Sequence, residues 1–202
     1  MILKRFVLLF AIAACVGAIA VSGVAIWQLA SRGADGAGRA AIGGPFQLID
    51  AAGRPVGDAD FRGRRMLIHF GYTYCPDVCP TELQAMSVAL DRLGGAAEAI
   101  QPLFITVDPE RDTPEQLASY CKHFHPRLLC LTGTPEQVAS AAKSYRVFYA
   151  RTRSRDRDAP ADSYLMDHSA YIYLMSADGA YLTHFGPGTD PEAMAERIRR
   201  FL

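Results

Sequence analysis

A stretch of 25 uncharged residues near the start of the chain, residues 6–30, constrains the fold most strongly. As a helix rising about 1.5 Å per residue it would be roughly 37 Å long, enough to cross a hydrocarbon core of about 30 Å. Lys4 and Arg5 precede it and no acidic residue does. By the positive-inside rule we therefore expect residues 1–5 in the cytoplasm, a transmembrane anchor over residues 6–30, and the rest of the chain outside.

Two other signals would remove this segment from the mature protein. A cleaved signal peptide has an apolar stretch of about 7–15 residues before a small-residue cleavage site, and residues 18–20, AIA, imitate such a site. A lipoprotein signal would instead use residues 12–15 and lipidate Cys15. The apolar run continues well past Cys15, which a processed signal does not need, so the uncleaved anchor is favoured.

The anchor also predicts where the rest of the chain lies. No long presequence rich in Arg and Ser precedes the anchor, which favours a bacterial inner membrane with a periplasmic domain over a mitochondrial membrane. Residues 31–41, rich in Gly and Ala, predict a flexible tether. Residues 42–202 have the size of one domain. After residue 30 there are 19 Lys and Arg against 21 Asp and Glu, a balance that gives no reason to expect a nucleic-acid partner.

Hydrophobic runs alternate with helical patterns along residues 42–202. Strands are expected at 45–50, 66–70, 103–107, 128–131, 147–150, 171–175 and 180–185, and helices at 81–93, 113–124, 134–145 and from 191 onwards. This alternation, closed by a β-hairpin and a helix, predicts a three-layer α/β sandwich with a mixed sheet. Residues 149–161 alternate Arg and Asp and predict an exposed hairpin extension.

Two cysteines, Cys75 and Cys79, stand in the sequence GYTYCPDVCP, each directly before a proline. They follow an expected strand and open the next helix, which is the order of a thioredoxin-type redox pair, although three residues separate them instead of two. Pro80 suits a first helical turn, so unpaired backbone N–H groups should stabilise the thiolates and lower both pKa values. A disulfide across so short a loop gains little chain entropy, which disfavours a purely structural bridge. A redox dithiol and a metal clamp remain.

Two thiolates suit a soft ion such as Cu(I), and one imidazole would complete a three-coordinate site. His168 is the best-placed histidine, since it lies in the expected loop before strand 171–175. In a thioredoxin-like fold that loop lies beside the dithiol and carries a cis-proline, where this chain has Asp167 and His168. His69 lies within a buried strand and is interpreted as a core residue. His184 is interpreted as a half-exposed strand residue.

A second group, Cys121, His123, His125 and Cys130, has the spacing C-x-H-x-H-x₄-C. Zinc is disfavoured here because the spacing matches no common zinc pattern and Pro126 breaks the backbone between the ligands. A disulfide between the two cysteines and a pair of free buried thiols both remain open, since the expected compartment permits disulfides without requiring them.

Four motifs together resemble the Sco/SenC family. They are GYTYCPDVCP, VDPERDTPE at 107–115, LTGTPEQV at 131–138 and MDHSAYIYLM at 166–175. Members of this family are membrane-anchored, thioredoxin-like copper proteins that assist the assembly of cytochrome c oxidase. The resemblance implies one copper ion, Cu(I) or Cu(II), held by Cys75, Cys79 and His168. Tyr74 stands where the family often has a histidine, so that position offers no ligand here.

The resemblance also implies partners. These are cytochrome c oxidase subunit II, whose dinuclear copper centre would receive the metal, together with an unidentified copper donor and an unidentified thiol reductant. The first hypothesis is therefore a copper metallochaperone, which a disulfide between Cys75 and Cys79 would empty because the thiolate is the ligand. The alternative is a thiol-disulfide oxidoreductase acting on exported proteins, for which Cys75 and Cys79 are the redox-active pair and His168 is not required.

Overall fold

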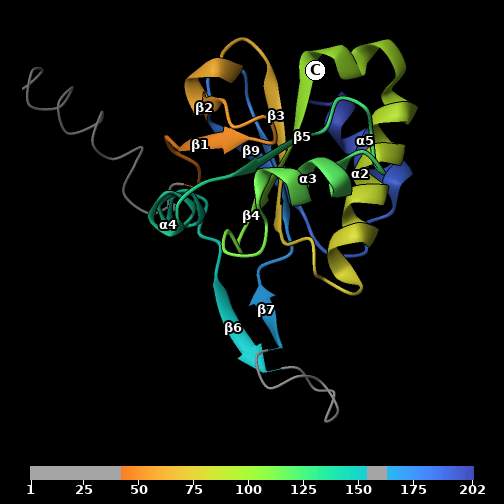
Figure 1. Cartoon of the computed structure of the whole chain (residues 1–202). Coiled ribbons are helices and arrows are strands. Elements are labelled where there is room, and N and C mark those ends of the chain that lie inside the picture. Colours follow the sequence, from red (N-terminus) through yellow and green to blue (C-terminus); the bar gives the residue numbers. More distant parts are fainter. Residues whose placement is uncertain (1–41, 154–162) are drawn as a thin grey trace, which may run out of the picture. The chain divides into compact units, whose positions relative to one another are not determined.

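The computed structural model describes residues 42–153 and 163–202. Within these ranges a seven-stranded mixed sheet has the order β2-β1-β5-β4-β3-β8-β9 (Figure 1). Its strands are β1 (Gln47–Asp50), β2 (Pro55–Gly57), β3 (Arg65–Gly71), β4 (Ile100–Thr106), β5 (Leu129–Thr132), β8 (Ile172–Met175) and β9 (Tyr181–Phe185). β3 pairs in parallel with β4, and β4 with β5, whereas the other neighbours pair antiparallel.

Helices cover both faces of this sheet. One face packs against α2 (Val78–Leu93), α3 (Pro114–Cys121) and α5 (Pro191–Arg199). The opposite face packs against α4 (Pro135–Ser144), with the short 3-10 helix η1 (Asp58–Phe61) contributing to the same cluster, while η2 (Gly94–Ala99) follows α2. Figure 1 shows α4 on one side of the sheet and α2 with α5 on the other. This three-layer arrangement confirms the predicted mixed α/β, thioredoxin-like fold.

Strand β3 is buried along six of its seven residues because helices cover both of its faces. Ile68 and Phe70 belong to the α4-side cluster, whereas Leu67 belongs to the α2-side cluster. Since side chains alternate along a strand, His69 and Gly71 share the α2 side with Leu67. Strand β3, which was expected to contribute only to the core, thus directs the imidazole of His69 towards α2. Gly71 lies on the same side and has no side chain to fill the space there.

Helix α2 begins three residues earlier than predicted, and Pro80 is its third residue, within the first turn as expected. The N-cap is Asp77, and Cys79 is the second helical residue. The early start is tolerated because the first four N–H groups of a helix have no partner within it, and Pro80 lacks an N–H. The helix ends at Gly94, whose φ of 56° suits a residue without a side chain.

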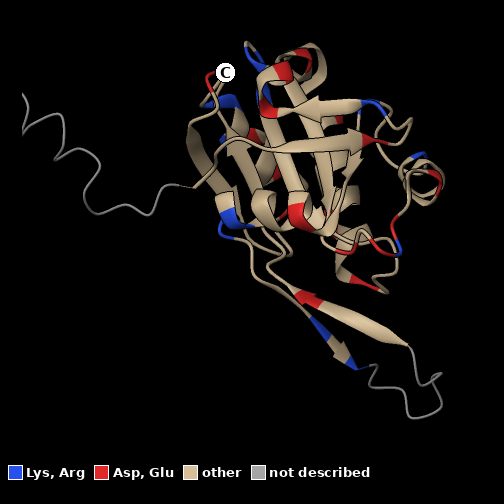
Figure 2. Cartoon of the chain, turned by 60° about the vertical axis from the view of Figure 1, so that its left-hand side comes forward, with Lys and Arg blue, Asp and Glu red and all other residues tan. Residues whose placement is uncertain are grey.

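A separate two-stranded ribbon projects from the domain, formed by β6 (Tyr149–Arg153) and β7 (Tyr164–His168) (Figure 1). Residues 149–153 of the predicted hairpin extension form β6, and Figure 2 shows charged residues on both strands of the ribbon. Its return strand was not predicted, because the ribbon has only one buried residue and lacks a clear hydrophobic alternation. The expectation that His168 lies in a loop is therefore wrong, since it ends β7. Residues 154–162 lie outside the described residues.

The predicted anchor at residues 6–30 and the tether at 31–41 also lie outside the described residues. Residues 42–202 form a compact unit by themselves. Within residues 42–153 and 163–202, no helix has both the length and the apolar character needed to cross a membrane.

Candidate metal centre

Cys75 and Cys79 lie at the start of α2, beyond the carboxyl end of β3, and differ in their surroundings. Cys75 is half-buried in the loop, whereas Cys79 is fully buried and donates its backbone N–H to Cys75 Sγ at 3.4 Å. The hydrogen bond from the Cys79 side chain is the main cause that lowers the pKa of Cys75 to about 5, with help from the N–H groups of Cys79 and Asp77. The same contact and then burial raise the pKa of Cys79.

The expectation that both thiols have lowered pKa values is therefore correct for Cys75 and wrong for Cys79. The helix N-terminus cannot ionise both sulfurs at once, because the first thiolate repels a second negative charge beside it. Without metal, the pair holds one thiolate on the solvent side and one thiol on the buried side.

A buried carboxylate, Asp112, fixes the loop that leads into the cysteines. It accepts hydrogen bonds from Thr73 N at 3.1 Å, from Thr73 Oγ1 at 2.6 Å and from Thr106 Oγ1 at 2.6 Å. These bonds connect the segment after β3 to the end of β4. Nothing in the sequence around Asp112 predicts this role, because Thr73, to which it bonds, is distant in the chain.

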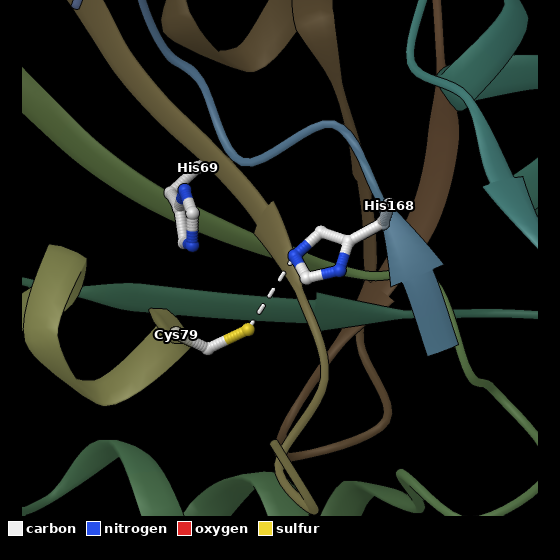
Figure 3. Close-up of side chains that lie close together, drawn as sticks. All are labelled: His69, Cys79 and His168. Carbon is white, nitrogen blue, oxygen red and sulfur yellow. Dashed lines mark hydrogen bonds between the residues drawn. The ribbon is translucent and has the colours of Figure 1, made fainter. Parts of the chain in front are cut away.

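His168 brings an imidazole to the buried sulfur. Its Nε2 lies 3.5 Å from Cys79 Sγ, and Figure 3 shows the two side chains facing each other from β7 and α2. The other ring nitrogen, Nδ1, lies 3.3 Å from the Met166 carbonyl oxygen. A proton on Nδ1 donated to that carbonyl leaves the lone pair of Nε2 directed at the sulfur. The ring also meets Tyr72 edge-on, with 5.7 Å between ring centroids.

The far end of β7 is attached to the domain by a small polar network. Tyr164 donates its hydroxyl to Asp108 Oδ1 at 2.9 Å, and Arg111 Nη1 donates to the Tyr164 carbonyl at 3.0 Å. The Arg111 guanidinium lies 3.7 Å from the Tyr164 ring centroid and 4.8 Å from that of Tyr74, beside Cys75. Asp108 therefore helps to hold the strand that carries His168.

His69 also faces this centre, which the sequence analysis did not predict. It is fully buried, as expected, but only its Nδ1 has a partner among the described residues, the Tyr171 carbonyl oxygen at 3.4 Å. Burial first, and then the charge of His168, lower the pKa of His69 to about 3, so the ring is neutral. One donor atom each from His69, Cys79 and His168 all lie within 4.8 Å of one another. The sequence did contain one signal for this site, a histidine within an otherwise apolar strand.

Gly71 and an open cleft give the centre room and access. A Cβ added at Gly71 would lie 2.8 Å from Cys79 Sγ and 3.3 Å from His69 Nε2, so a larger residue would occupy the space between the donors. On the outer side, a cleft of about 480 Å³ runs between the cysteine loop and the β6–β7 ribbon, and Cys75, Met166 and His168 are among its lining residues. A partner or a metal carrier can therefore approach Cys75 and His168 from solvent.

The second group of cysteines and histidines is not a metal site in this structure. Cys121, at the end of α3, forms a disulfide with Cys130 in β5, with 6.6 Å between their Cα atoms. This answers the question that the sequence left open. The remaining candidate histidine, His184, lies on β9 and bonds to the Tyr181 hydroxyl through its Nδ1.

Comparisons with known proteins agree on one family. The family model described as SCO1/SenC matches residues 34–202. The mitochondrial SCO1 homolog 1 of Arabidopsis thaliana is 41% identical over 172 residues, which cover 85% of this chain and 50% of that protein. The SCO2-like protein of Rickettsia conorii is 43% identical over 158 residues, which cover 78% of this chain and 76% of that protein.

A solved structure agrees with this assignment. The copper-bound structure of ScoI from Bradyrhizobium japonicum is 44% identical, with a TM-score of 0.71 over 80% of this chain and 100% of that one. The chain spans about half the length of the Arabidopsis protein that it matches. A family match over most of the sequence, joined to this fold, leads to one conclusion: the chain belongs to the SCO1/SenC family.

Proposed function

We propose that this chain is a copper metallochaperone that binds one copper ion through Cys75, Cys79 and His168 and helps to assemble the dinuclear copper centre of cytochrome c oxidase subunit II. The observation that carries the proposal is the 3.5 Å approach of His168 Nε2 to Cys79 Sγ, with the Cys75 thiolate on the same loop. The copper bound in the Bradyrhizobium structure supports the choice of metal.

The donor set suits copper chemically. Two thiolates and an imidazole form a soft, three-coordinate set of the kind that Cu(I) prefers. With metal–ligand distances of about 2.0–2.3 Å, adjacent donors around a trigonal ion lie about 3.5–4 Å apart, which the Cys79–His168 separation already satisfies. Binding displaces the proton of the Cys79 thiol. Oxidation of the two thiols to a disulfide removes both thiolates, so the redox state of the pair controls metal retention.

We also propose a membrane topology for the chain. Residues 1–5 are cytoplasmic, residues 6–30 anchor the protein in a bacterial inner membrane, and the tether at 31–41 carries the domain of residues 42–202 in the periplasm. The uncharged length of the segment and the flanking Lys4 and Arg5 support this arrangement. Partners on that side would be oxidase subunit II, a copper donor and a thiol reductant.

A second function, thiol–disulfide exchange with exported proteins, has an observation of its own in its favour. Cys75 is a half-buried thiolate with a pKa of about 5, and Cys79 is a buried thiol with a raised pKa. That asymmetry suits an attacking sulfur and a resolving sulfur. The Cys75 thiolate would attack a substrate disulfide to form a mixed disulfide, and Cys79 would then displace the reduced substrate.

Removal of the imidazole distinguishes the two functions. In the full-length, reduced chain, His168→Ala should weaken Cu(I) binding strongly and leave exchange with a model disulfide nearly unchanged. His123→Ala removes an exposed histidine at the end of α3 and is the matched control. Competitive Cu(I) titration measures affinity, and X-ray absorption counts the neighbours, expected as two sulfurs and one nitrogen. Unchanged Cu(I) affinity in His168→Ala would contradict the metallochaperone assignment.

A further inference from the structure

The Nε2 atom of His69 is a buried polar atom that the fold does not explain. Within residues 42–153 and 163–202 it has no hydrogen-bond partner, and the side chain is fully buried. An unsatisfied buried polar atom destabilises the folded protein, and an apolar side chain in this strand would avoid that cost. The cost calls for a function of this nitrogen.

The direction in which Nε2 of His69 points suggests that it binds metal. Figure 3 shows His69, Cys79 and His168 converging from β3, α2 and β7, and their donor atoms lie within 4.8 Å of one another. Each imidazole has its Nδ1 near a backbone carbonyl oxygen, that of Tyr171 for His69 at 3.4 Å and that of Met166 for His168 at 3.3 Å. Metal-binding histidines commonly have this outer hydrogen bond, since it fixes the ring and leaves the other nitrogen to the ion.

We propose that His69 is a fourth donor of the centre and that it serves Cu(II). This inference rests on the proposed function and deepens it. Two thiolates and one imidazole satisfy Cu(I), whereas Cu(II) favours four donors in a tetragonal arrangement. His69 supplies the fourth from the buried side, where Gly71 leaves space beside its Nε2. The centre thereby holds both oxidation states of copper without recruiting a ligand from solvent.

The fourth donor has two consequences. Because it favours Cu(II) over Cu(I), it lowers the Cu(II)/Cu(I) reduction potential of the bound ion. It also makes Cys75 less essential to Cu(II), because His69, Cys79 and His168 alone form a His₂Cys set, a combination that binds Cu(II) in other proteins. Cys75 can then leave the ion to meet a partner while the ion remains bound.

The test compares full-length wild type with His69→Phe, which keeps a ring of similar size in the strand, and with His123→Ala as the control. Electron paramagnetic resonance with nitrogen hyperfine analysis should count two imidazoles on Cu(II) in wild type and the control, and one in His69→Phe. Cu(II) affinity should fall about tenfold or more. Cu(I) affinity should stay within about threefold of wild type. A tenfold selective loss corresponds to a rise of about 59 mV in the potential.

An unchanged nitrogen count and Cu(II) affinity in His69→Phe would overturn this inference and leave the proposed function standing, whereas a wild type that binds no copper would overturn both. If His69→Phe fails to fold, Cys75→Ser provides the second route. That variant should retain Cu(II) with two imidazole nitrogens and one sulfur, and a single nitrogen in its spectrum would equally exclude His69 as a donor.

Discussion

Gly71→Ala is the most direct perturbation of the space that the structure keeps open at the centre. An added Cβ would lie 2.8 Å from Cys79 Sγ, 2.8 Å from a ring atom of Phe104 and 3.3 Å from His69 Nε2. Contacts between such atoms normally lie at about 3.5–4.0 Å, so two neighbours must each move by roughly 0.7 Å. Both belong to fully buried side chains, on α2 and β4, that have little freedom to move.

The expected loss of stability follows from these overlaps. Overpacking of this kind costs about 1–3 kcal/mol. Replacing glycine by alanine restricts the unfolded chain and returns about 0.4–1 kcal/mol, so a net loss of about 1–2 kcal/mol is expected. With an m-value of about 2 kcal/mol/M, the urea midpoint should fall by roughly 0.5–1 M. Copper binding should weaken as well, because the displaced atom is the Cys79 sulfur.

Urea unfolding of the metal-free protein, followed by competitive copper titration of the folded variant, measures both effects. Gly95→Ala is the control, since nothing lies within 4 Å of a Cβ added there. It should leave the urea midpoint unchanged or raise it slightly, and copper affinity should not change. A Gly71→Ala protein with the urea midpoint and copper affinity of wild type would refute the close approach of Gly71, Cys79 and His69 described above.

Three further predictions concern other parts of the domain. Asp112→Ala leaves the half-buried Thr73 donors and the buried Thr106 hydroxyl without their acceptor and should lower the free energy of unfolding by about 2–4 kcal/mol, measured by urea titration. In the metal-free, reduced protein, the rate of Cys75 alkylation should rise with pH and level off above its pKa of about 5, and a midpoint near the usual thiol value would be inconsistent with the Cys79 hydrogen bond. Replacing both Cys121 and Cys130 by alanine removes a disulfide between residues nine positions apart. The free energy of unfolding should fall by about 2.5–3 kcal/mol, measured by the same unfolding assay.

The fold class followed from the sequence because its signals are local and repeated. Thr113 and Thr134, the first residues of two predicted helices, cap α3 and α4 with their side chains. Buried strands such as β3 are continuous apolar runs between charged or glycine boundaries, so β3 was found to within one residue at each end. The approach of His168 to Cys79 followed from the fold class, since a thioredoxin-like sheet puts the loop before β8 beside the start of α2.

What the sequence did not predict depends on contacts between distant elements. The raised pKa of Cys79 arises from a neighbouring thiolate and from burial, neither of which a motif specifies. The role of Asp112 requires the ends of β3 and β4 to be adjacent. For His69, burial was predicted, but the unpartnered nitrogen became visible only when β3, α2 and β7 were brought together.

The contact of His168 with Cys79 connects the β6–β7 ribbon to the start of α2. A two-stranded ribbon is at best marginally stable by itself, so the β6–β7 ribbon depends on its contacts with the rest of the domain. At one end of β7 these are the bonds of Tyr164 to Asp108 and Arg111, and at the other end His168 meets Cys79. Under the proposed ligand set, an ion shared by His168 and the cysteines would add a bond at the second end and stabilise the ribbon in the position that binds metal. By the same thermodynamic linkage, a partner that binds the ribbon in a different position would weaken copper binding, and one that binds it in this position would strengthen copper binding.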